Sequence, residues 1–85
     1  MEGAALTEAL SIADAPTTAR EAAAALRGRF AGLTVVVVDA FDMRGETPAA
    51  TGSRRSLYFG AREGHCWQVT SDPTQVSGLF VADRG

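Results

Sequence analysis

The sequence predicts a small α+β domain: two N-terminal helices on one face of a four-stranded, mainly antiparallel sheet, with a short helix before the last strand. Three observations predict this class. Two alanine-rich segments with helical spacing of apolar residues open the chain, and four short segments rich in valine and aromatic residues follow. About eight residues join the last two of these segments, whereas a parallel crossover needs a dozen or more.

The two helical segments open the chain. The first covers Gly3–Ala13, with Leu6 and Leu10 on one side. The second begins at Thr18. The Thr18 hydroxyl and the Glu21 carboxylate, three residues apart, are expected to form a capping box at its start. The apolar stripe of the second helix consists of Ala19, Ala22, Ala23, Leu26 and Phe30.

The strongest strand signal is Leu33–Phe41, which contains four consecutive valines. Apolar and polar residues do not alternate in it, so both of its faces need cover, and a central position in the sheet is the simplest interpretation. The next segment, residues 42–55, has no hydrophobic period and is rich in glycine, threonine, proline and arginine. A loop of this length in so short a chain is typically functional or mobile.

Residues 56–70 predict a β-hairpin, with two possible registers. A two-residue loop, Glu63-Gly64, divides the large residues between the two faces of the hairpin. A three-residue loop, 62–64, gathers all the large apolar residues except Tyr58 on one face and puts Gly64 where a left-handed residue is needed. We expect this second register. Its pairs are Ala61 with His65, Phe59 with Trp67 and Leu57 with Val69.

The C-terminal segment predicts a helix of one to two turns followed by the last strand, residues 79–83. Asp72 is placed to cap the helix, Pro73 occupies its first position and Gly78 ends it. The order of the strands in the sheet is left open by the sequence.

Composition excludes several classes of protein. The net charge is −2, and there is no lysine and no basic run, which argues against sequence-independent nucleic-acid binding. The longest mostly apolar run, Leu33–Val38, is too short to cross a membrane, and the first ten residues lack the basic region of a secretory signal. With one cysteine no internal disulfide can form. We expect a cytoplasmic protein, and the abundance of alanine and arginine suggests a GC-rich bacterial source.

The length fits one domain over residues 1–85, with residues 1–15 loosely attached. Although 46% of the residues are hydrophobic, 16 of them are alanine, so the core is small. Additional burial against a partner or a second copy of the chain would therefore contribute to stability.

Three groups of residues are candidates for chemistry. The sole histidine and the sole cysteine are adjacent, His65-Cys66, but neighbouring strand residues point to opposite faces, so we expect no metal site and no Cys–His nucleophile within one chain. Asp39 and Asp42 form a carboxylate cluster if they meet Asp72, yet no base accompanies them, and helix capping explains Asp72 better.

The third group is in the long loop, where small residues precede Arg54 and Arg55 and could cradle a phosphate or a carboxylate. The segment has neither the spacing nor the lysine of a Walker motif, so the signal is weak. It remains the best place for anion binding because it carries the densest positive charge.

The second face of the sheet is the expected interface. If the helices cover the face of Leu57 and Phe59, then Val36, Val38 and Tyr58 lie on a face without cover. An exposed apolar patch of this kind marks an interface or a pocket, and we expect a homodimer through it.

The C-terminal half resembles a family of small uncharacterised bacterial proteins found among nitrogen-fixation genes. The resemblance rests on Tyr58, His65-Cys66, Thr70, Asp72 and Gly78, and on the helix-to-strand junction Ala25–Gly32. The chain departs from the family pattern at Pro73, at Trp67 and in its four valines. The resemblance implies a cytoplasmic accessory protein linked to nitrogen fixation, without an established active site.

We therefore expect a non-enzymatic accessory or binding protein, without a cofactor, that acts through a protein interface as a homodimer or with another protein partner. The alternative is a domain that responds to a small ligand, an anion or a metal. It would use the His65/Cys66 hairpin, with Tyr58 and Asp72 nearby, or the Arg54/Arg55 loop.

Overall fold

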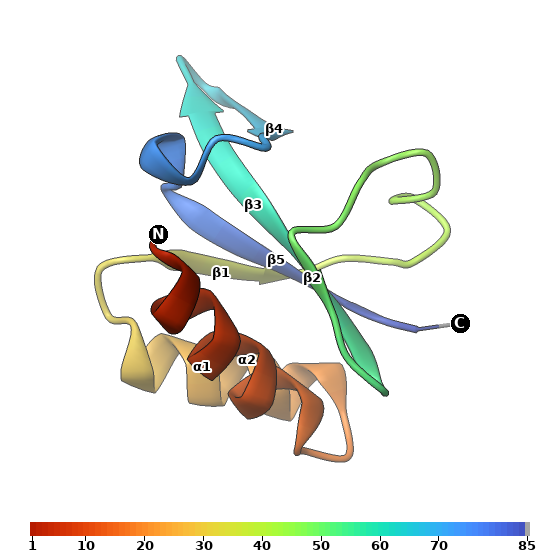
Figure 1. Cartoon of the computed structure of the whole chain (residues 1–85). Helices are drawn as coiled ribbons and strands as arrows, with labels where there is room; N and C mark the ends of the chain where they lie inside the picture. The colour runs from red at the N-terminus through yellow and green to blue at the C-terminus, as the bar shows by residue number, and fades with distance from the viewer. Residues whose placement is uncertain (85) are drawn as a thin grey trace.

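The computed structural model describes residues 1–84, and it confirms the α+β class (Figure 1). Within these residues, two helices cover one face of a five-stranded sheet with the order β1-β5-β3-β2, in which β4 pairs with β3. The elements are α1 (Gly3–Asp14), α2 (Ala19–Arg29), β1 (Thr34–Val37), β2 (Ala50–Thr51), β3 (Arg55–Glu63), β4 (Cys66–Val69), a single 3-10 turn η1 (Pro73–Gln75) and β5 (Gly78–Asp83).

Both helices lie where the sequence predicts them. At the start of α2, the Glu21 N–H donates to the Thr18 hydroxyl at 3.1 Å, and that hydroxyl donates to the Glu21 carboxylate at 2.9 Å. Alanine side chains fill much of the space between the helices and the sheet, which allows the two layers to approach closely. The buried residues of this core are Ala9, Ala13, Ala22, Ala23, Leu26, Val35, Leu57, Phe59, Leu79 and Val81.

The valine-rich strand lies at the edge of the sheet, so the predicted central position is wrong. It runs parallel to β5, with Val35 opposite Leu79 and Val37 opposite Val81. The chain between β1 and β5 contains three strands and η1, which is long enough for a parallel crossover. The sheet is therefore mixed: β5 is antiparallel to β3 and parallel to β1. The short connection joins β4 to β5, and these two strands run in the same direction because both are antiparallel to β3, so the expectation that it joins antiparallel strands is wrong.

The register of the hairpin also differs from the prediction. The turn consists of Gly64 and His65, with Glu63 paired to Cys66 and Arg62 to Trp67. Gly64 has the predicted positive φ, 63°, as the first residue of the turn. Trp67 consequently lies on the second face of the sheet, where its ring packs edge-on against Phe80 with centroids 6.0 Å apart. Because Trp67 gains this contact with Phe80 of β5, a register that puts Trp67 and Phe59 on opposite faces of the sheet is favourable.

The segment 42–55 contains the strand β2, which pairs with β3 through Ala50–Leu57 and Thr51–Ser56. Two residues are too few to show an alternating pattern, so this strand gives no signal in the sequence. The Asp72 cap is confirmed: its carboxylate accepts the Thr74 N–H at 2.9 Å, and Pro73 opens the turn. Gly78, expected to end that helix, is the first residue of β5.

Candidate interaction surface at the β1 edge

The hairpin residues His65 and Cys66 are both exposed at the tip between β3 and β4. In the part of the chain that the structure describes, no group of three or more histidine, cysteine, aspartate or glutamate side chains is placed to hold a metal ion. Asp72 lies at the end of the sheet where β5 begins, whereas Asp39 follows β1 at the end where the parallel strand β5 finishes. The structure therefore does not bring these two carboxylates together.

The arginine loop holds a carboxylate that belongs to the chain itself. The Asp14 carboxylate, at the end of α1, accepts three successive backbone N–H groups: Ser53 at 3.0 Å, Arg54 at 2.6 Å and Arg55 at 3.0 Å. A Cβ atom at Gly52 would lie 2.7 Å from that carboxylate, so a larger residue at this position would require the Asp14 side chain to shift. The backbone of this turn is an anion-binding concavity, and it fastens α1 to the sheet.

These hydrogen bonds predict an acid-sensitive contribution to stability. The Arg54 N–H bond is the largest cause that holds the pKa of Asp14 below its usual value of 3.8, and the Arg55 and Ser53 bonds add to it against desolvation. Because the pKa is lowered in the folded state, the stabilisation is complete above the unfolded pKa and is lost as the pH falls through the folded one. We expect Asp14→Asn to lower the melting temperature at pH 7 and to flatten its decline below about pH 4.

The matched control for this titration is Asp42→Asn, which changes an exposed loop carboxylate. Thermal melts of both variants between pH 2 and pH 7 test the assignment. An Asp14→Asn melting curve that follows the wild type at every pH would contradict a stabilising role for the three N–H bonds.

The two loop arginines have different surroundings. Arg54 is exposed, and its guanidinium lies 3.4 Å from the carbonyls of Ala15 and Pro16. Arg55 is only 2% exposed: Nη1 donates to the Pro16 carbonyl at 2.9 Å. The Arg55 Nε lies 2.6 Å from Asp83 Oδ1 in an ion pair that lacks the alignment of a hydrogen bond. Arg55 thus contacts the ends of α1 and β5 rather than solvent.

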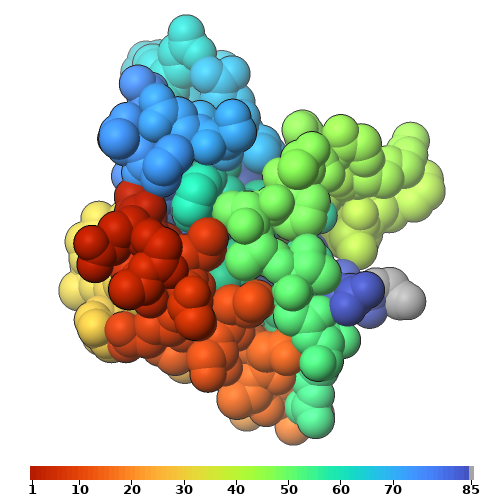
Figure 2. All heavy atoms as spheres, viewed as in Figure 1, coloured from red at the N-terminus to blue at the C-terminus, as the bar shows by residue number. Residues whose placement is uncertain are grey.

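On the second face of the sheet, Tyr58 is 8% exposed because the segment after β1 turns back over it. Met43, from this segment, packs with Tyr58, Phe80 and Ala82, and Val38 is half-buried beside them. Figure 2 shows the yellow-green chain that follows β1 as a lobe projecting from the body of the molecule. Of the three expected interface residues, Val36 is the exposed one, at 37%.

Exposed apolar side chains concentrate at β1. Three large apolar residues of the described chain are exposed: Val36, Val37 at 43% and Phe41 at 67%. Val36 lies on the second face, Val37 lies on the helix-covered face, and Phe41 follows the strand with the Arg44 guanidinium 3.9 Å from its ring centre. An apolar surface therefore runs along one edge of the sheet.

The backbone of β1 is open along this edge. The N–H groups of Thr34 and Val38 donate to Ser77 and Val81, so the even-numbered residues bond to β5 and the backbone groups of Val35 and Val37 point outward. Arg27 of α2 covers one of these groups: its Nη2 and Nε donate to the Val35 carbonyl at 2.7 and 3.2 Å. A charged side chain over an open edge disfavours pairing with other chains, so a strand that is added at β1 must displace Arg27 from the Val35 carbonyl.

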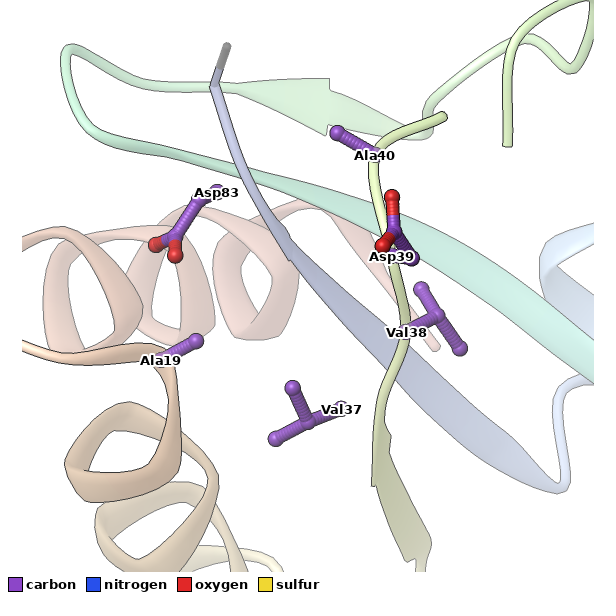
Figure 3. Close-up of a pocket in the computed structure, with 6 residues that line it drawn as sticks. All are labelled: Ala19, Val37, Val38, Asp39, Ala40 and Asp83. Carbon is purple, nitrogen blue, oxygen red and sulfur yellow. The ribbon is translucent and has the colours of Figure 1, made fainter. Parts of the chain in front are cut away.

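A pocket of about 460 Å³ lies at the C-terminal end of β1 (Figure 3). Ala19 at the start of α2 and Val37 contribute apolar walls, and Asp39 and Asp83 contribute carboxylates. The Asp39 carboxylate accepts the Phe41 N–H at 2.7 Å, which fixes the turn after the strand. The remaining lining residues are Val38 and Ala40.

Sequence reasoning missed Arg27, Val37 and Asp83 as surface determinants. They come from α2, β1 and β5, which meet at this edge only through the order of the strands. The run of valines was the available signal, but it indicates apolar faces and not an open edge. Comparison with family models, with curated proteins and with solved structures finds no match. No helix among the described residues is both long and apolar enough to span a bilayer.

Proposed function

We propose that this protein is a non-enzymatic interaction module that binds an extended partner strand along the β1 edge. The observation that supports this function is the coincidence, on β1, of outward-pointing backbone groups at Val35 and Val37 with the exposed apolar side chains of Val36 and Val37. Strand addition uses both features, since main-chain hydrogen bonds supply affinity and alternate side chains fit the partner.

The alternative, an anion-responsive Arg54/Arg55 loop, has less support. The turn before β3 already holds the Asp14 carboxylate, and Arg55 is buried against Pro16 and Asp83. An external anion would have to displace these contacts. The link to nitrogen fixation stays a prediction from the resemblance, and the proposed module is compatible with an accessory role in a bacterial cytoplasm.

A proline at Val37 tests strand addition directly. Proline removes an N–H group and is tolerated on edge strands where that N–H faces away from the sheet, as at Val37. Peptides selected from a random displayed library on the wild-type protein should bind Val37→Pro at least about tenfold more weakly, a loss of about 1.4 kcal/mol. Fluorescence anisotropy with labelled peptides gives the two dissociation constants.

The matched control is Val37→Thr, which keeps the N–H group and the branched Cβ and should bind within about threefold of the wild type. Circular dichroism establishes that both variants are folded. Selected peptides that bind all three proteins equally would contradict an edge-strand site. So would a library that gives no binder to a chain that is also monomeric.

A further inference from the structure

We propose that the strand that binds the β1 edge is the β1 strand of a second copy of this chain, paired antiparallel, and that Arg27 of each copy enters the pocket between Asp39 and Asp83 of the other. This inference rests on the proposed strand addition and names its partner. Three features of the edge lead to it: its backbone pattern, the position of Arg27 and the chemistry of the pocket.

The backbone groups of β1 are complementary to themselves. Val35 and Val37 each present an outward N–H and C=O, and an antiparallel pair exchanges both hydrogen bonds between two such residues. When Val35 of one copy lies opposite Val37 of the other, the second such pair follows by symmetry. The two copies of Val36 then face each other across a two-fold axis, which is the symmetry of most homodimers. Both exposed valines would become covered.

Arg27 must leave the Val35 carbonyl in this arrangement, because the Val37 N–H of the second copy takes its place as donor. Since the two-fold axis is perpendicular to the sheet, both helical layers lie on the same side. Val35 of one copy faces Val37 of the other, and Val37 is a wall of the pocket. The displaced Arg27 side chain therefore lies beside the pocket of the second copy, on the side of the sheet that α2 covers.

The pocket has the chemistry to receive an arginine. Val37 and Ala19 provide apolar walls for the aliphatic stem, and the Asp39 and Asp83 carboxylates can accept guanidinium N–H groups. Asp83 contacts Arg55 on its inner side but is 65% exposed, so it has acceptor capacity left on its outer side. Because Arg55 of the same copy already pairs with Asp83, Asp39 is the carboxylate to which the second copy's Arg27 adds a positive partner.

Charge reversal separates this arrangement from other dimers. Sedimentation equilibrium should show a wild-type dimer. Arg27→Glu alone or Asp39→Arg alone should weaken dimerisation and raise the dissociation constant of the dimer at least about tenfold. The double variant Arg27→Glu/Asp39→Arg restores opposite charges across the interface and should return to within about threefold of the wild type. Arg62→Glu, on the exposed end of β3, is the matched control and should leave the dimer unchanged. Circular dichroism melts report the fold of each variant.

Each other outcome overturns a defined part of the proposal. A wild-type chain that stays monomeric while selected peptides bind at Val37 overturns the second copy and leaves strand addition in place. A dimer that Val37→Pro abolishes but charge reversal does not change overturns the exchange of Arg27. A dimer that is indifferent to Val37→Pro overturns the edge-strand function itself. Failure of the double variant to recover, with its fold intact, overturns the pairing of Arg27 with Asp39.

Discussion

Replacing Gly78 with alanine is expected to lower the free energy of unfolding by about 3 kcal/mol, at the upper end of the usual cost of overpacking. A Cβ atom at this position would lie 2.5 Å from the Thr34 carbonyl oxygen and 3.0 Å from the Trp67 ring. Because the first of these is a backbone atom of the paired strand, β1 itself must move away from β5. For a domain of this size, the melting temperature should fall by roughly 12 °C or more.

Gly28→Ala provides the control for the Gly78 variant. Gly28 lies within α2, and nothing is within 4 Å of the place where its Cβ would be. The same substitution should therefore raise stability there by about 1 kcal/mol, because alanine is the better helix former. Thermal melts followed by circular dichroism measure both variants. A Gly78→Ala protein as stable as the wild type would contradict the close contact between β1 and β5.

Arg55→Met is expected to lower the free energy of unfolding by about 2–3 kcal/mol, as for the loss of hydrogen bonds to a charged group. The buried guanidinium donates to the carbonyl groups of Pro16 and Ala13 at the end of α1, and methionine satisfies neither. The ion pair with Asp83 adds little to this figure because the Asp83 side chain is 65% exposed. Urea unfolding followed through the fluorescence of Trp67, the only tryptophan, measures the loss.

The neighbouring Arg54→Met variant is the matched control. Its guanidinium is exposed and makes two contacts of 3.4 Å, so stability should change by less than about 0.5 kcal/mol. Equal losses in the two variants would show that position 55 has no special structural role. If the wild-type chain bound phosphate and an Arg55→Met protein of unchanged stability did not, this result would favour the anion-responsive alternative instead.

Local signals in the sequence predicted a large part of the fold. The cap at Thr18 and the cap at Asp72 are confirmed, and both helices lie where apolar spacing placed them. The second half of the predicted capping box differs, because the Glu21 carboxylate accepts from the Thr18 hydroxyl rather than from the Thr18 N–H. Gly64 has the expected positive φ, yet the hairpin register around it was wrong. The expected register places all the large apolar residues except Tyr58 on one face of the hairpin. The second face, however, has its own cluster, in which Phe80 of β5 receives Trp67.

The candidate surface was less accessible to prediction. Val36 was expected at an interface and is exposed, but Tyr58 is covered by the chain that carries Met43. Arg55 was expected to bind an anion and instead contacts the end of α1. Arg27 gave no signal because its role depends on the Val35 carbonyl being at an open edge, which follows from strand order alone.

The sequence by itself determined the α+β class, the helices and their caps, because these depend on residues within one or two turns of each other. The tertiary structure alone decided that β1 lies at the edge of the sheet and that Asp14 binds the turn at residues 53–55. Apolar side chains on both faces of a strand indicate that both faces are covered. They do not indicate whether another strand lies beside it, because neighbouring strands pair through backbone groups that every residue except proline shares. The valine run therefore identified a strand with two apolar faces, and only the packing of the whole chain left its edge open.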